Sequence, residues 1–334
     1  MNNIEQIANW FVIAYISIVG LCIGSFLNVA ILRGLSGEDL CFARSKCPSC
    51  GNLIKWYMNI PVFSYLFLRG KCAYCKSKIS WQYPLVEIIY GCLFLGIYLL
   101  FGFCPKTYFL WAFFALFVAM AGTDFKESVI IDIHAYILFA LGLVYSFLQI
   151  GDVNIIQGLI GAAVGFILFE AMARIGLLIA GCRMFGEGDS LIALGLGAIF
   201  GWKTLLIIFA LSVLIQSFST IPILVIKSFK QKKIKFGISY ILVFIGMALI
   251  WAVNQFKLIV NDNYYLIFVI VVCAFLIWAL KNILFEIKER KLDETQAEEE
   301  KFNLMPFGPA LILASSLCFF FLPQIKSLIL DFIN

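Results

Sequence analysis

The sequence predicts an all-α polytopic membrane protein with about eight to ten transmembrane helices. Its 334 residues are 63% hydrophobic and only 13% charged, and the mean hydropathy is +0.98. A soluble domain has an apolar share nearer half, so this composition excludes a soluble globular protein. The second observation is a series of long apolar runs separated by short polar breaks, which is the pattern of a chain that crosses a bilayer repeatedly.

Ten apolar runs define the expected spans. Runs of about twenty residues cross the hydrocarbon core, and the sixth run here is short, so it is either re-entrant or merged with its neighbour. The spans are expected near residues 9–31, 85–103, 107–123, 133–150, 155–180, 190–201, 203–226, 237–254, 264–284 and 307–323.

The loop between the first two spans, residues 33–83, is rich in Lys and Arg, whereas the segment before the first span has neither. Basic residues are retained on the cytoplasmic side, so we expect this loop to be cytoplasmic. Counting the spans forward places the breaks at 123–132 and 181–190 on the same side. The net charge of +5 is explained by these loops, which predicts contact with a lipid bilayer and not with nucleic acid.

Four cysteines in this loop, Cys47, Cys50, Cys72 and Cys75, form two Cys-x-x-Cys pairs. Four thiolates can complete a tetrahedral zinc shell, and such a site folds a loop too small to bury a core of its own. The sequence therefore predicts a zinc-ribbon-like loop with a four-cysteine site, although another metal would satisfy the same spacing. A pair of redox disulfides, as in a membrane thiol oxidoreductase, is the alternative, and the reducing cytoplasm disfavours it.

Two aspartates lie at cytoplasmic breaks in the apolar pattern. Asp124 directly follows the third span, and Asp189 precedes the sixth. Gly186 and Gly188 surround Glu187 and allow positive φ or a close backbone approach beside Asp189. Ionisable groups at the membrane boundary are costly, so their presence together on one side suggests a functional site.

Two neighbouring carboxylates in a poorly hydrated site share a proton and titrate as a pair. One can activate water while the other donates a proton, as peptide hydrolysis requires, so Asp124 and Asp189 are the candidate catalytic residues. Taken singly, Asp124 would be a helix end solvated by headgroups and Asp189 a helix N-cap. Asp132 opens the fourth span and is expected to be an N-cap or a supporting residue.

Three other polar positions lie in or beside apolar runs. Glu170 and Arg174 are four residues apart and are expected to form an ion pair within one helix. His134 lies just inside an apolar run, where neither a metal-binding nor a catalytic role is expected. Glu87 follows Pro84 and either contacts a polar ligand at the cytoplasmic face or simply lies at the interface.

Seven segments together resemble the type IV prepilin peptidases, the bifunctional leader peptidases and N-methyltransferases of pilus and type II secretion systems. They are residues 24–29 (GSFLNV), 44–50 (RSKCPSC), 59–61 (NIP), 68–75 (LRGKCAYC), 83–87 (YPLVE), 186–189 (GEGD) and 306–309 (PFGP). Two local departures occur. Ile131 stands where the family often has Pro, and Leu191 where it often has Lys.

The resemblance implies that Asp124 and Asp189 cleave the leader of a type IV prepilin or pseudopilin, and that the new N-terminus is methylated with S-adenosylmethionine. It implies a methyltransferase region over residues 1–103 and a peptidase region over 104–334 with an insertion at about 227–304, in a bacterial inner membrane. A thiol oxidoreductase and a non-enzymatic scaffold or transporter remain as alternatives.

Overall fold

The computed structural model describes residues 3–37, 44–127, 130–180, 185–230 and 307–333. All regular elements in these ranges are helical, and six of the helices are long and apolar enough to cross a membrane. The polytopic all-α prediction is therefore confirmed. The expected spans at 237–254 and 264–284, and the expected insertion from residue 231 onward, lie outside the described residues.

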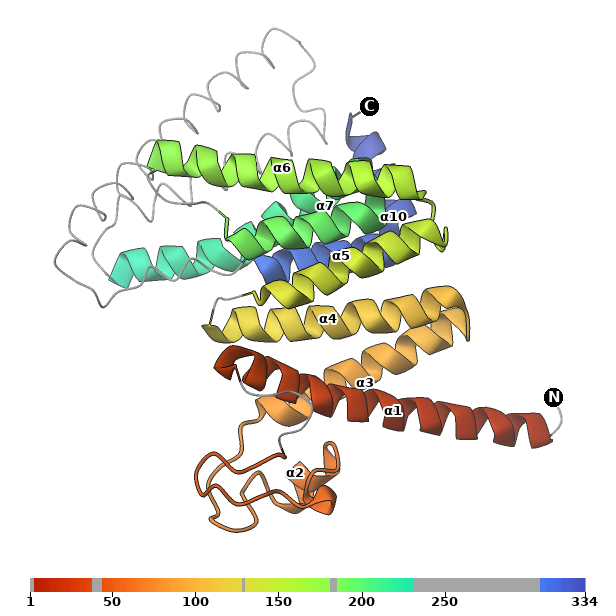
Figure 1. Cartoon of the computed structure of the whole chain (residues 1–334), viewed down its shortest axis with the longest axis vertical. Coiled ribbons are helices and arrows are strands. Elements are labelled where there is room, and N and C mark those ends of the chain that lie inside the picture. The colour runs from red at the N-terminus through yellow and green to blue at the C-terminus, as the bar shows by residue number, and fades with distance from the viewer. Residues whose placement is uncertain (1–2, 38–43, 128–129, 181–184, 231–306, 334) are drawn as a thin grey trace, which may run out of the picture. The chain divides into compact units, whose positions relative to one another are not determined.

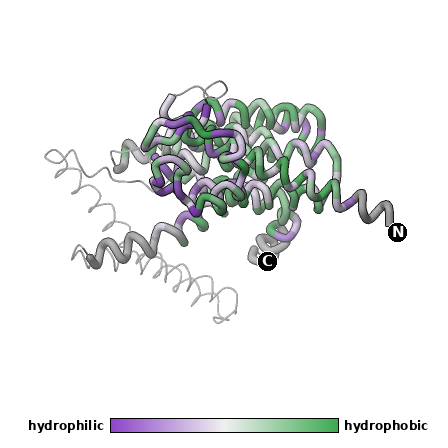
Figure 2. The backbone as a smooth tube through the Cα atoms, turned by 90° about the horizontal axis from the view of Figure 1, so that it is seen from below, coloured by the Kyte–Doolittle hydropathy of each residue, from purple (hydrophilic) through white to green (hydrophobic). Residues whose placement is uncertain are grey.

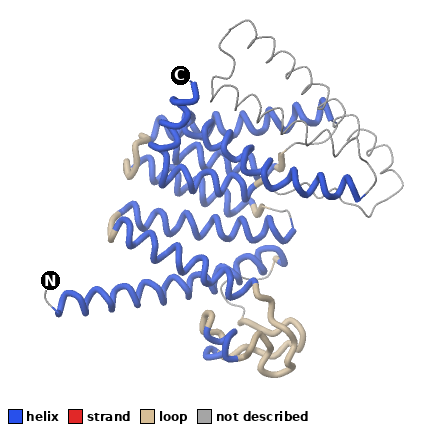
Figure 3. Tube along the Cα trace, turned by 180° about the vertical axis from the view of Figure 1, so that it is seen from behind, coloured by secondary structure: helices blue, strands red, loops and turns tan. Residues whose placement is uncertain are grey.

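The described ranges contain seven long helices (Figure 1): α1 (Asn3–Ser36), α3 (Gln82–Phe101), α4 (Pro105–Glu127), α5 (Asp132–Phe147), α6 (Ile155–Ala180), α7 (Glu187–Lys230) and α10 (Gly308–Ile333). Two short helices, η1 (Trp56–Met58) and α2 (Phe63–Phe67), lie in the loop between α1 and α3. That loop is the largest stretch of irregular backbone in the picture (Figure 3), and hydrophilic residues gather in it while hydrophobic residues run along the helices (Figure 2).

The chain forms two compact units. The first contains residues 1–168 and 187–205, and the second contains 169–186 and 206–334. In the second unit, an aromatic cluster joins Phe169, Phe185, Phe209 and Phe307, with ring centroids 4.9 to 6.5 Å apart. The last helix of this unit begins at Gly308, immediately after that cluster. The candidate site lies in the first unit.

Close backbone contact joins α1 to α3. A Cβ atom on Gly24 would lie 2.8 Å from Glu87 Cα, so only glycine permits this approach. One turn further along α1, the buried Asn28 side chain donates to the Tyr83 carbonyl oxygen at 3.0 Å. Gly24 and Asn28 lie four residues apart and so share one helix face. Gly24 and Asn28 of the 24–29 motif thus lie on the face of α1 that contacts α3.

Aromatic packing joins α3 to α4. The rings of Phe94 and Trp111 stack at 3.9 Å, and the Trp111 indole N–H donates to the Phe94 carbonyl oxygen at 2.9 Å. The Tyr90 hydroxyl donates in return to the Trp111 carbonyl oxygen at 2.8 Å. These contacts satisfy buried polar groups in an apolar setting, so they fix the separation of the two helices.

Small residues pack α5 and α6 against the first half of α7. On α5, Gly142 faces Ala198, and Leu138 faces Gly195, so α5 and α7 run in the same direction. On α6, Gly165 faces Ala193 and Gly161 faces Gly197, so α6 runs the opposite way. Close approach through small residues is the usual means of helix association in membranes. The starts of α5 and α7 consequently lie at the same end of the unit (Figure 1).

The short sixth span is merged with its neighbour. Residues 187–230 form one element, α7, which is interrupted at Gly201, where φ is 68° and ψ is 167°. This conformation is outside the helical region and suits glycine alone. The predicted boundary between the sixth and seventh spans therefore falls at this kink.

Candidate active site and cysteine cluster

Asp124 lies in the last turn of α4 and is only 4% exposed. Thr123, beside it, is fully buried and donates to the Met120 carbonyl oxygen at 3.0 Å. Gly122 packs directly against Ile31 of α1. The end of α4 is therefore held against α1, and the carboxylate is buried in the protein and not solvated as at an exposed helix end.

Asp189 lies in the first turn of α7 and is 6% exposed. Gly188, the residue before it, is pressed against Ile130, which belongs to the connection between α4 and α5. The Gly188 backbone does not adopt positive φ, so its role is the close approach. Gly186 lies directly before α7.

The structure brings the two aspartates to one end of one compact unit. Asp124 closes α4, the 130–131 segment leads from there to α5, and Gly188 joins that segment to the start of α7. The parallel packing of α5 and α7 fixes this arrangement. Two buried carboxylates at the same end of the unit, one closing α4 and one opening α7, can act as an acid and base pair. Their catalytic role remains a prediction.

The N-cap prediction for Asp132 is wrong. The N-cap of α5 is Ile131, whose backbone is extended, and Asp132 is the first helical residue. Its carboxylate is exposed. An acidic group in the first turn is favourable to the helix dipole, which explains its place without a cap hydrogen bond. Its supporting role in the site stays a prediction.

The four cysteine Sγ atoms converge, all within 4.8 Å of one another, and Cys47 and Cys75 are 3.9 Å apart. Their backbones form two matching turns. The Gly51 N–H donates to the Cys47 carbonyl oxygen at 2.8 Å, and the Lys76 N–H donates to that of Cys72 at 3.1 Å. Gly51 and Lys76 both have positive φ, at 69° and 61°. The repeated geometry is that of two metal-binding knuckles.

Hydrogen bonding favours the thiolate form of two of these four thiols. Backbone N–H groups of Cys50 and Ser49 lower the pKa of Cys47 to about 6. The side chain and N–H of Ser77 lower the pKa of Cys75. A metal ligand must be a thiolate, so both shifts favour coordination. A metal site requires all four sulfur atoms to lie close together, whereas two disulfides require only that the sulfur atoms of each pair lie close together. The cluster can therefore hold a metal ion.

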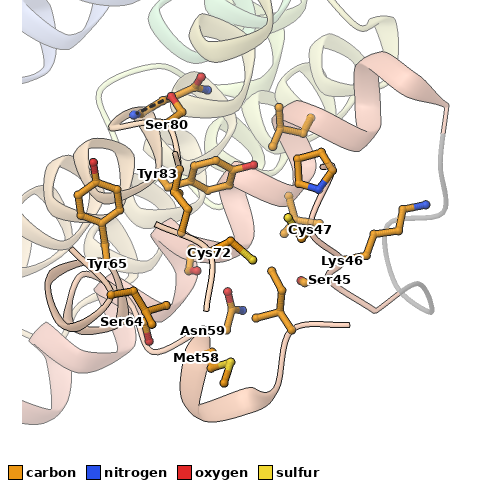
Figure 4. A pocket seen from close by; sticks show the side chains of 18 of the residues that line it. Ser45, Lys46, Cys47, Met58, Asn59, Ser64, Tyr65, Cys72, Ser80 and Tyr83 are labelled. Atoms are coloured by element: carbon orange, nitrogen blue, oxygen red, sulfur yellow. Dashed lines mark hydrogen bonds between the residues drawn. The ribbon is translucent and has the colours of Figure 1, made fainter. Parts of the chain in front are cut away.

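A cavity of about 680 Å³ borders the cysteine cluster (Figure 4). Cys47 and Cys72 lie in its wall, and Tyr83, Ser45 and Asn59 surround it from different segments of the chain. The sequence did not predict this cavity, because its walls come from segments that are distant in the chain.

Glu87, whose role the sequence left open, also lines this cavity and is 6% exposed. It accepts a 2.7 Å hydrogen bond from the Val62 N–H. In the sequence, the only indication of a role for Glu87 was its place in the 83–87 motif. Elsewhere, the predicted ion pair of Glu170 with Arg174 is confirmed at 3.0 Å, and His134 is buried.

Comparisons with known proteins match two family models to this chain. One is described as the bacterial Peptidase A24 N-terminal domain and covers residues 18–101, and the other as the type IV leader peptidase family and covers residues 111–221. No solved structure matches the chain.

Curated proteins named prepilin leader peptidase/N-methyltransferase align with it. That of Myxococcus xanthus (strain DK1622) is 34% identical over 58% of this chain and 57% of that protein. That of Klebsiella pneumoniae is 32% identical over 58% of this chain and 86% of its own length. That of Aeromonas hydrophila is 30% identical over 72% of this chain and 91% of its own length. The chain therefore belongs to the type IV leader peptidase family.

Proposed function

We propose that this protein cleaves the leader peptide of type IV prepilins or type II secretion pseudopilins at the cytoplasmic face of the bacterial inner membrane, and N-methylates the new terminal residue. The observation that carries the peptidase activity is the burial of Asp124 and Asp189 at the same end of one compact unit. Membership of the family supplies the substrate class.

The pair would work as a shared-proton acid and base. The ionised member accepts a proton from water as the water attacks the scissile carbonyl carbon. The protonated member donates to the carbonyl oxygen, and a proton then passes to the leaving amine. Burial strengthens these electrostatic interactions because little water screens them. A leader that stays in the cytoplasm, ahead of an apolar helix in the bilayer, would present its scissile bond at this depth.

We further propose that the metal held by Cys47, Cys50, Cys72 and Cys75 is zinc in a structural role. Four thiolates leave no position for water or substrate, which is the donor set of a closed site. The loop around them has little core of its own, so the metal would stabilise its fold.

S-adenosylmethionine is the proposed methyl donor, and it supplies an electrophilic methyl group when bound. The described residues of the N-terminal region fit such a ligand. The cavity next to the cysteine cluster has the volume of a small-molecule site and contains the buried carboxylate of Glu87. Residues 1–103 would thus form the methyltransferase region and 104–334 the peptidase region.

The test is a mass-spectrometric cleavage assay on full-length protein in detergent, with a prepilin and S-adenosylmethionine. Asp124→Asn and Asp189→Asn should each abolish loss of the leader. Asp152→Asn, an exposed carboxylate between α5 and α6, is the matched control and should cleave normally. Cleavage that survives both site substitutions would show that another group performs the hydrolysis.

A further inference from the structure

The loop between α1 and α3 carries charge of one sign. Residues 44–86 contain seven Lys or Arg side chains and no Asp or Glu. Lys55, Arg69 and Lys71 are exposed at its surface. Because no carboxylate within this segment balances them, the positive potential of the loop extends into its surroundings and attracts anionic groups. An anionic surface is therefore the partner that the charge of this loop complements.

The two faces of α2 have different surroundings. Tyr65 lines the cavity next to the cysteine cluster, and its ring packs against Gly70. Phe63, Leu66 and Phe67 lie three and four residues apart, so they share the opposite face of the helix. All three are exposed, and Phe67 is 85% exposed. Three large apolar side chains gathered on one exposed helix face mark an interaction surface, whereas a single one would not.

A further exposed ring lies beside α2. Trp56, the first residue of η1, is 81% exposed. The Ile60 N–H donates to Ser64 Oγ at 2.8 Å, and that hydroxyl donates to the Tyr57 carbonyl oxygen at 3.2 Å. Ser64 belongs to α2, so these two bonds hold η1 against it. The apolar surface of the loop comprises Trp56, Phe63, Leu66 and Phe67.

This surface is fixed with respect to the membrane-spanning helices. The N–H of Val62, the N-cap of α2, donates to Glu87 Oε2 of α3 at 2.7 Å, and Glu87 is buried. Figure 1 and Figure 3 both show α2 alongside α1 and not beyond its C-terminal end. A segment beside a spanning helix lies near the depth at which that helix enters the bilayer. The apolar surface is therefore close to lipid.

Basic side chains lie at both ends of the apolar surface. Lys55 directly precedes η1, and its ammonium group lies 5.9 Å from the Tyr57 ring centroid. Arg69 follows α2 after one residue. Segments that bind to the surface of a bilayer have this composition, because aromatic and aliphatic groups enter the boundary of the acyl chains while Lys and Arg contact the phosphates. Trp prefers this boundary in particular.

We propose that the apolar surface of the loop inserts into the bilayer at the C-terminal end of α1, with Lys55 and Arg69 against anionic phosphate headgroups. The loop then has three attachments to the membrane, namely α1, α3 and this surface. An apolar helix of a protein substrate would also cover the four side chains, but a bilayer supplies in addition the anionic phosphates that the two basic residues complement. The proposal is independent of both enzymatic activities, because it concerns where the loop lies and not what it catalyses.

The first test identifies what contacts the surface. Full-length protein carrying a benzophenone amino acid in place of Phe67 is reconstituted into nanodiscs of phosphatidylcholine and phosphatidylglycerol, irradiated and analysed by intact mass. A second preparation carries the same group in place of Asn52, which is exposed in the same loop but outside the apolar surface. We expect lipid adducts at position 67 and few at position 52. Equal yields at the two positions, no lipid adduct at position 67, or an adduct there only with added prepilin would overturn the proposal.

The second test measures the contribution of charge. Lys55→Gln with Arg69→Gln should lower the yield of lipid adducts at position 67 by about fivefold or more, the effect expected of one Lys or Arg beside an anionic surface. Replacing phosphatidylglycerol with phosphatidylcholine should lower the yield similarly. The matched control, Lys76→Gln with Lys78→Gln, removes the same charge beyond the second cysteine pair and should leave the yield near that of wild type. An equal loss in both double variants, or no loss in the first, would show that Lys55 and Arg69 do not bind headgroups and would overturn their proposed role.

Discussion

Gly188 lies directly against Ile130, so that a Cβ atom at position 188 would lie 2.6 Å from the Ile130 Cβ. Real Cβ atoms do not approach this closely, and backbone must move before any side chain fits at position 188. The contact joins the first turn of α7 to the segment that follows Asp124. The relative position of Asp124 and Asp189 thus depends on residue 188 being glycine, which has no side chain.

Gly188→Ala should consequently reduce leader cleavage by about 100-fold, because a displacement of about 1 Å has that effect on a reaction that depends on alignment. Methylation of a pre-cleaved peptide should be unchanged, since the cavity is built from other segments. Both rates can be measured by mass spectrometry on one preparation.

Two further variants test the cause of that loss. Gly96→Ala, where an added Cβ meets nothing within 4 Å, should behave as wild type. Ile130→Gly combined with Gly188→Ala removes the obstructing Cβ and should restore part of the cleavage. Failure of the double variant to recover would show that the contact is not what positions Asp189.

Asn28→Leu should destabilise the packing of α1 on α3. The substitution removes the donor to the Tyr83 carbonyl oxygen, which then lies in an apolar contact without that hydrogen bond. The expected loss is about 1 kcal/mol, the size of such interactions in membrane proteins. Unfolding in detergent measures it. Ser17→Ala is the control, because the Ser17 hydroxyl bonds only to Ile13 of its own helix and its removal should have little effect.

Removal of the metal should affect methylation and leave cleavage nearly intact. Cys47 and Cys72 belong to both the cluster and the cavity wall, whereas the aspartates are held by helix packing. Cys50→Ser should lower the metal content of purified protein, measured by mass spectrometry of the bound element, together with the methylation rate. Cys92→Ser, in an exposed position of α3, is the matched control. Parallel loss of cleavage would contradict the separation of the two sites.

Thiol labelling tests the proposed sidedness. Cys104 lies between α3 and α4, on the side opposite the cysteine loop, and is partly exposed. A membrane-impermeant maleimide should label it in intact spheroplasts and should label Cys47 only after lysis and removal of the metal by a chelator. Hydrogen bonds from the side chain and N–H of Thr107 lower the pKa of Cys104, so its labelling should persist to lower pH than that of an ordinary thiol. Protection of Cys104 before lysis would reverse the topology.

Polar interruptions made the helix boundaries predictable. The fourth span was expected at residues 133–150, and α5 covers Asp132–Phe147. The chain turns at Gln149, where φ is 50°, so the helix stops before the apolar run does. The first helix instead continues past its apolar run to Ser36. The local sequence predicts which segments interrupt the helices, but it predicts the exact first and last residue of each helix less accurately.

Long-range packing was not predictable in the same way. Glycines at 161 and 197 face one another only because α6 and α7 are neighbours, and no local pattern states which helices are neighbours. The role of Glu87 could not be predicted for a similar reason. The sequence near a helix start is the same whether the carboxylate is solvated by water or accepts a hydrogen bond from the Val62 N–H. The aspartates were found because ionisable groups are rare beside apolar runs.

The compactness of the cysteine cluster also bears on how the protein is made. All four ligands precede α3 in the chain, and the turns around them are closed by hydrogen bonds within residues 45–79. Translation therefore delivers the complete metal site while the second span is still inside the ribosome. Ion capture can precede insertion of that span, so a cell short of the metal would be expected to fail at biogenesis, with newly made chains degraded before they reach their working form.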